Sequence, residues 1–143
     1  MSDQFIQAGL KLNGRCLCEG VSYEIDGPLT DARNCHCSIC RKAHSAAFRS
    51  RASVRAQDFR WIAGENLVTW YETSPGTHRG FCSRCGSALL SRFDENPDAY
   101  GLSLGCLDTD PGIRPAMHIH VGSMAPWFEI TDALPRYEAG PPR

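Results

Sequence analysis

The chain has 143 residues and a mass of 15.8 kDa, a length typical of one compact domain with a hydrophobic core of its own. Its composition, 42% hydrophobic and 22% charged, is that of a globular protein and excludes a disordered or fibrous chain. The formal net charge of −1 provides no overall positive field, so neither a nucleic acid nor an anionic membrane surface is expected as a partner.

The pattern of apolar and charged residues also bears on cellular location. The longest stretch without Asp, Glu, Lys or Arg, residues 115–128, is interrupted by two His, two Pro and one Gly, so no membrane-spanning helix is expected. Residues 1–14 contain an acidic residue and no apolar segment, which argues against a secretory signal. We therefore expect a cytoplasmic protein, and eight cysteines in a reducing compartment indicate metal binding or catalysis before disulfides.

Short segments with alternating apolar and polar residues recur along the chain and predict β-strands. Strands are predicted over 21–25, 60–62, 67–71, 87–93 and 118–121. One short helix is predicted within 37–47 and a single helical turn over 125–130, with turns at 74–76, 96–98 and 110–112. The sequence therefore predicts a mainly β fold with few short helices.

Seven of the eight cysteines fall into three groups, and two of these groups suit one structural metal site. Cys82 and Cys85 have the spacing of a zinc knuckle and are followed by Gly86, whose flexible backbone allows amide groups to face the sulfurs. Cys16 and Cys18 would leave the same face of an extended segment. Together the two pairs supply the four thiolates of a structural zinc site. Disulfide pairing is the alternative, and it would require an oxidising compartment.

The third group, Cys35, Cys37 and Cys40, offers three thiolates within six residues. Three protein ligands with one open position are typical of a catalytic zinc site. In the alternative interpretation a fourth residue completes the coordination shell of the metal, and the ion is structural. The candidates for that closing ligand are Cys106, His36, His44, His118 and His120. His118 and His120 are predicted to share a strand face, where a histidine is more often packed or exposed than bound to metal, so neither is assigned as a ligand.

A basic segment follows the third cysteine group. Between positions 41 and 60 there are six basic residues and one acid. The basic residues are Arg41, Lys42, Arg49, Arg51, Arg55 and Arg60, and the acid is Asp58. This segment either forms a solvated strand surface or binds an anion beside the cysteines.

These motifs, in this order and spacing, resemble those of the glutathione-dependent formaldehyde-activating enzyme family, which also includes centromere protein V. The residues that carry the resemblance lie at 14–18, 35–42, 81–89, 105–108 and 117–119, together with Trp127. The resemblance implies a domain over 12–137, preceded by an extension over 1–11 and followed by a flexible tail over 138–143. It also implies a β-tent fold of several short antiparallel sheets held together by two zinc ions per chain.

The same resemblance implies a role for each cysteine group. Cys16, Cys18, Cys82 and Cys85 would hold the structural zinc, and Cys35, Cys37 and Cys40 the catalytic zinc. The chain departs from the family pattern at Glu19, at Ala46 and at Cys106, which stands where Thr is common, and none of these positions belongs to the proposed ligand set. Cys106 is interpreted as a buried small apolar residue, with a further ligand or a redox partner as alternatives.

The implied activity is that of a zinc-dependent carbon–sulfur lyase, similar to S-(hydroxymethyl)glutathione synthase, which joins glutathione and formaldehyde. The donor set agrees, because zinc on three thiolates accepts a fourth sulfur more readily than it activates water. A small-molecule thiol is therefore the expected partner, and the basic segment would orient its carboxylates. The alternatives are a non-catalytic, zinc-stabilised protein-binding module and a thiol redox sensor.

Overall fold

The computed structural model describes residues 11–142 and is mainly β in this part of the chain. Ten strands form two sheets, and a single α-helix, α2 (Ser38–His44), accompanies them in the described residues. The strands are β1 (Lys11–Arg15), β2 (Ser22–Asp26), β3 (Thr30–Cys35), β4 (Arg49–Arg55), β5 (Phe59–Ala63), β6 (Val68–Ser74), β7 (Thr77–Cys82), β8 (Ala88–Phe93), β9 (Asn96–Ser103) and β10 (His118–Ile119). Residues 1–10 of the expected N-terminal extension lie outside the described residues. No helix between residues 11 and 142 has the length and apolarity needed to cross a bilayer.

The smaller sheet has the strand order β1-β2-β5 and is antiparallel throughout. Its inward face carries Leu12, Tyr23 and Ile25, all of them buried, while the residues between them face outward. This alternation is the pattern that predicts a half-buried strand, and it places the small sheet on one side of the main hydrophobic core.

The larger sheet has the order β10-β3-β4-β9-β8-β7-β6. Every neighbouring pair is antiparallel except β10 and β3, which run parallel, with His118 opposite Asn34. The expectation of purely antiparallel sheets is wrong for this pair, because the chain crosses from β9 through residues 104–117 before it reaches the outer side of β3.

The two faces of the larger sheet differ in polarity. On one face Ala52, Leu90 and Leu102 lie opposite one another on adjacent strands and are buried in the core. On the other face the directly paired residues are Ser53, Gly101, Ser91, Arg79 and Tyr71. Residues directly opposite in a ladder share a face, so this row of side chains forms a polar surface across five strands.

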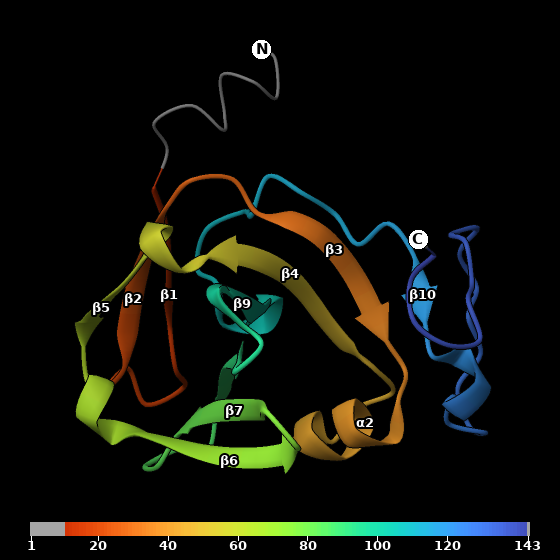
Figure 1. Cartoon of the computed structure of the whole chain (residues 1–143), viewed down its shortest axis with the longest axis horizontal. Coiled ribbons are helices and arrows are strands. Elements are labelled where there is room, and N and C mark those ends of the chain that lie inside the picture. The colour runs from red at the N-terminus through yellow and green to blue at the C-terminus, as the bar shows by residue number, and fades with distance from the viewer. Residues whose placement is uncertain (1–10, 143) are drawn as a thin grey trace.

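Figure 1 shows the arrangement of these elements as three sides of a triangle. Strands β1, β2 and β5 form one side, β3 and β4 the second, and β6 and β7 the third. Helix α2 lies at the corner between the second and third sides, and the segment that follows β10 packs outside β3.

Several predicted elements are confirmed and others are wrong. The strands predicted near 21–25, 60–62, 67–71 and 87–93 and the helix within 37–47 are present. The turn predicted at 96–98 lies inside β9, because the chain reverses at residues 94–95 instead. The strand predicted to reach residue 121 ends at Ile119, because His120 adopts a left-handed backbone with φ of 56° and a 3-10 turn, η4 (Val121–Ser123), follows. His118 and His120 therefore do not share a strand face.

Candidate metal centres and the adjoining cavity

The four-cysteine cluster is assembled from two turns that are far apart in the sequence. The Sγ atoms of Cys16, Cys18, Cys82 and Cys85 all lie within 4.8 Å of one another. Cys16 Sγ is 3.5 Å from Cys18 Sγ, which is 3.8 Å from Cys82 Sγ. This grouping connects the turn after β1 with the turn after β7 and so ties the two sheets together.

The first pair of this cluster converges in a different way from the one the sequence indicated. Cys16 and Cys18 lie in a tight turn and not in an extended segment, since the N–H of Glu19 donates to the carbonyl of Cys16 at 3.0 Å. Glu19 adopts a left-handed backbone with φ of 66°, which closes the turn. The turn also lets the N–H of Val21 donate to Cys16 Sγ at 3.3 Å.

Hydrogen bonds favour the ionised form of sulfur on the second pair. The N–H of Arg84 donates to Cys82 Sγ at 3.4 Å. The hydroxyl of Ser87, 3.3 Å from Cys85 Sγ, and the backbone N–H of Ser87 lower the pKa of the Cys85 thiol to about 5. Four sulfurs at these separations, with N–H donors aimed at them, match the ligand set of a structural zinc ion.

The three-cysteine cluster is local and forms where β3 passes into α2. Cys35 ends β3, Cys37 is the N-cap of α2, and Cys40 lies in the first turn of the helix. The Cys37 sulfur accepts a hydrogen bond from the N–H of Cys40 at 3.3 Å, which satisfies a free amide at the helix start. The three Sγ atoms lie within 4.8 Å of one another, and those of Cys35 and Cys40 belong to buried residues.

Arg79 of β7 reaches this cluster from the opposite side of the corner. Its Nη2 donates to Cys40 Sγ at 3.4 Å and its Nε donates to the hydroxyl of Thr73. Hydrogen bonds from the Cys35 and Cys37 thiols, followed by the Arg79 guanidinium, hold the pKa of Cys40 well below the ordinary value. The cluster therefore favours thiolate at Cys40, as a metal ligand requires.

No fourth protein ligand joins these three sulfurs in the described part of the chain. None of the candidates named from the sequence, Cys106, His36, His44, His118 and His120, places a ligand atom within 4.8 Å of all three. The Cys106 thiol donates instead to the carbonyl of Ala88 at 3.5 Å, and burial raises its pKa. The closed-shell alternative thus lacks a ligand between residues 11 and 142, and the geometry agrees with an open position.

A buried chain of hydrogen bonds supports the segment between Cys35 and Cys37. His36 Nε2 lies 2.8 Å from His118 Nδ1, and His118 Nε2 lies 2.9 Å from a carboxylate oxygen of Asp132. Both histidines are almost fully buried, and His36 packs against the ring of Phe48. No sequence motif indicates this chain of hydrogen bonds, because its members lie on three separate segments.

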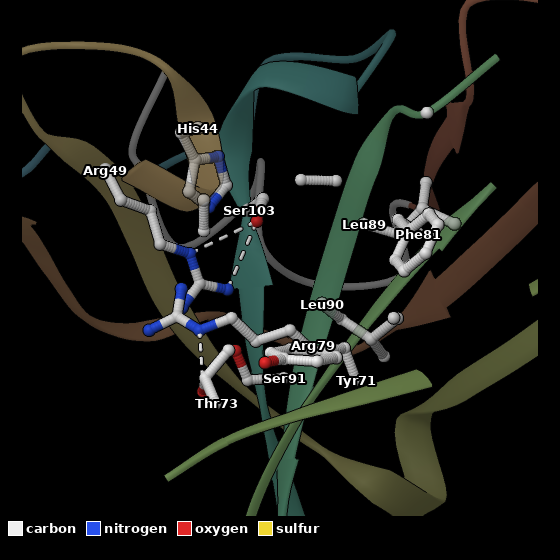
Figure 2. A pocket seen from close by; sticks show the side chains of 14 residues that line it. His44, Arg49, Tyr71, Thr73, Arg79, Phe81, Leu89, Leu90, Ser91 and Ser103 are labelled. Atoms are coloured by element: carbon white, nitrogen blue, oxygen red, sulfur yellow. Dashed lines mark hydrogen bonds between the residues drawn. The ribbon is translucent and has the colours of Figure 1, made fainter. Parts of the chain in front are cut away.

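A cavity of about 430 Å³ opens on the polar face of the larger sheet beside Arg79. Figure 2 shows the guanidinium groups of Arg49 and Arg79 inside it, next to Ser103 and Thr73. Phe81 and Leu89 form part of an apolar wall. None of the three cysteines lines the cavity, and Arg79 lies between it and Cys40.

The basic segment predicted at 41–60 does not form one surface. Arg49 lines the cavity, whereas Arg51 is hydrogen-bonded to Ser53 outside it. Arg41 donates to the carbonyl of Ser123. The other charged members face solvent or pair with acids: Lys42 is exposed, Arg55 pairs with Asp58, and Arg60 pairs with Glu24 and Asp26. Arg79, which belongs to no motif visible in the sequence, is the second arginine of the cavity.

Comparisons with known proteins agree with this geometry. The sequence profile of the family described as "Glutathione-dependent formaldehyde-activating enzyme" matches residues 11–123. A Halomonas elongata protein named "Putative glutathione-dependent formaldehyde-activating enzyme" is 32% identical over 128 residues, which cover 83% of this chain and 80% of that protein. A crystal structure of a Rhodobacter sphaeroides protein superposes with a TM-score of 0.58 at 29% identity, covering 72% of this chain and 97% of that chain. The chain therefore belongs to the glutathione-dependent formaldehyde-activating enzyme family.

Proposed function

We propose that this protein is a zinc-dependent carbon–sulfur lyase that joins a thiol, glutathione, to formaldehyde and catalyses the reverse cleavage. The observation that carries the proposal is the cluster of Cys35, Cys37 and Cys40, three sulfurs beside an open cavity with no fourth ligand among residues 11–142. Family membership supports the same substrates. The name β-tent suits the three-sided arrangement of the sheets, and we adopt it as part of this proposal.

The ligand sets suit two zinc ions with different tasks. Cys16, Cys18, Cys82 and Cys85 would hold a closed structural site, and the three-cysteine cluster would hold the catalytic site. A zinc ion on three thiolates supplies a coordination position for the substrate sulfur and favours its deprotonated form. The proposal requires that all eight thiols stay reduced, as they do in the cytoplasm.

The protein's own groups would prepare the thiol and the carbonyl for reaction. Arg79 holds Cys40 by a charge-assisted hydrogen bond and so fixes one wall of the reaction site. In the forward direction the substrate sulfur attacks the carbonyl carbon of formaldehyde, and a carbon–sulfur bond forms. The carbon–oxygen π electrons move to oxygen, which takes up the proton that the thiol has lost. The reverse reaction breaks the same carbon–sulfur bond and releases both substrates.

The test combines metal analysis with a direct measurement of adduct formation. Purified protein should contain about two zinc ions per chain, in line with the two cysteine clusters. With ¹³C-formaldehyde and glutathione, NMR should show S-hydroxymethylglutathione forming faster than in the same buffer without protein. An unchanged rate in fully zinc-loaded protein would contradict the proposal and favour the protein-binding module.

A further inference from the structure

The cavity beside the three-cysteine cluster is lined by two arginines, Arg49 and Arg79. Arg49 is only 4% exposed, and its hydrogen bonds are to the hydroxyl of Ser103 and the carbonyl of Gly101. Neither Arg49 nor Arg79 forms an ion pair with a carboxylate of residues 11–142. Among these residues Arg49 is therefore buried without a counter-ion, and the anionic partner of Arg79 is the Cys40 thiolate alone. Burying a cation without a counter-ion is unfavourable, so this arrangement is suited to an anion from outside the chain.

Unused hydrogen-bonding groups lie in the same place. The Nη1 of Arg79 is buried and has no partner among the described residues, and the same holds for the hydroxyl of Ser91. Ser91 lies directly opposite Arg79 in the β7–β8 ladder, so both side chains belong to the polar face that lines the cavity. Buried donors of this kind are almost always satisfied in folded proteins, which points to a ligand as their partner.

The residues that line the cavity indicate which kind of anion it would bind. Burial, together with Arg49 and Arg79, lowers the pKa of His44 to about 4, so this lining residue adds no charge near neutral pH. Phe81 and Leu89 leave part of the wall apolar and suited to carbon atoms. A planar carboxylate on a short carbon chain fits an arginine fork beside an apolar wall.

We infer that Arg49 and Arg79 form a subsite for a carboxylate of the thiol substrate, and in glutathione for the glycyl carboxylate. The inference rests on the proposed function. The glycyl carboxylate is nearer to the sulfur along the molecule than the γ-glutamyl carboxylate. Arg79 Nη2 lies 3.4 Å from Cys40 Sγ, so an anion on this arginine is held close to the sulfur-binding position. The subsite makes the protein selective for acidic thiols over neutral ones.

The inference is tested by calorimetric titration of zinc-loaded protein with glutathione and with its glycyl ethyl ester. Loss of charge-assisted hydrogen bonds should weaken binding of the ester by about tenfold or more. Arg49→Lys keeps the charge but removes the forked guanidinium group. It should lower the affinity for glutathione to that for the ester. Arg51→Lys is the matched control, since Arg51 lies two residues away on the same strand and outside the cavity. It should bind glutathione as the wild type does.

The outcomes separate this inference from the function on which it rests. Equal affinity of the wild type for glutathione and its ester would overturn the carboxylate subsite while leaving thiol binding intact. Discrimination that persists in Arg49→Lys would assign the carboxylate to another part of the molecule and would also overturn the inference. If neither ligand binds to the zinc-loaded protein, both the subsite and the proposed function fail. Zinc content and melting temperature, measured for each variant, identify any protein that has not folded.

Discussion

The two cysteine clusters use the same ligand atom in opposite structural roles. In the first, sulfurs that are 64 positions apart, Cys18 and Cys82, meet between the two sheets. In the second, Cys35, Cys37 and Cys40 come from one strand-to-helix junction and connect no distant segments to each other. A metal ion in the first cluster therefore closes a long loop of the fold, whereas one in the second occupies a site that the fold already presents.

The surroundings of the clusters follow the same division. Around the first cluster most donors to sulfur are backbone amides, such as those of Val21 and Arg84, which exist only when the turns are formed. Around the second cluster one backbone amide, that of Cys40, donates to sulfur, and the further support comes from side chains, Arg79 and the buried pair of His36 and His118. Loss of metal from the first cluster should therefore unfold the protein, whereas loss of metal from the second should abolish its activity without unfolding it.

The largest effect is expected from Cys85→Ser, which removes one sulfur from the four-cysteine cluster. Metal affinity at a site that joins distant segments contributes directly to folding, so the free energy of unfolding should fall by about 5 kcal/mol or more. Thermal denaturation and zinc analysis measure this loss. Cys106→Ser is the control, because Cys106 belongs to neither cluster, and it should change stability by less than about 1 kcal/mol. A Cys85→Ser protein with normal melting and full zinc content would refute the structural role.

Cys37→Ser tests the other side of the comparison. Serine is itself a good N-cap, so α2 should still begin at the same residue while the sulfur ligand is lost. We expect about one zinc ion fewer per chain, a small change in melting temperature and no catalysed adduct formation. Mild chelation of the wild type should remove the same ion first, since three protein ligands bind less tightly than four. If chelation removes both ions equally and unfolds the protein, the two clusters do not differ in the roles proposed for them.

The cysteine clusters could be predicted from the sequence because metal ligands impose local spacing. The spacing of Cys82 and Cys85 and the three thiols between positions 35 and 40 are visible without any knowledge of the fold. The family followed from these motifs and is confirmed by the profile match. The mainly β fold followed from the alternating apolar and polar segments and is confirmed by the ten strands. Zinc itself stays a prediction.

Arg79 and Arg49 could not be paired from the sequence, because their meeting depends on strand order and register. Four strands, β7, β8, β9 and β4, must align before both arginines face one cavity, and a bulge in the β7–β8 ladder shifts the register on the way. Strand β4 was not predicted from the sequence for a related reason. Its side chains on the polar face include Arg49 and Arg51, at positions where a buried strand ordinarily carries apolar residues. Only Ala52 and Val54 on its other face follow the usual pattern.

Gly64→Ala should loosen the four-cysteine cluster without touching a ligand. Gly64 has φ of 78°, and an added Cβ would collide with the carbonyl of Gly20 in the loop that follows Cys18. Backbone strain and collision together should cost about 2–4 kcal/mol in urea unfolding. Gly86→Ala is the matched control, with φ of 81° but nothing within 4 Å of the new methyl group, and should cost about 1 kcal/mol. Equal losses would show that the collision with Gly20 adds nothing to the strain of the positive φ angle.

The smallest effect is expected at Asp132, which sharpens the comparison at the three-cysteine cluster. A carboxylate only accepts hydrogen bonds, so His118 must carry its proton on Nε2, and its Nδ1 then accepts from His36 Nε2. Asp132→Asn offers an amide donor instead and should reverse this order, which moves the His36 proton to Nδ1. Imidazole ¹⁵N NMR distinguishes the two tautomers, and the free energy of unfolding should fall by about 1 kcal/mol.

Because side chains support the three-cysteine cluster, Asp132→Asn should also speed zinc release from this site and leave the four-cysteine site unaffected. Unchanged imidazole spectra together with unchanged zinc release would mean that the two histidines only pack against Phe48 and do not support the cluster.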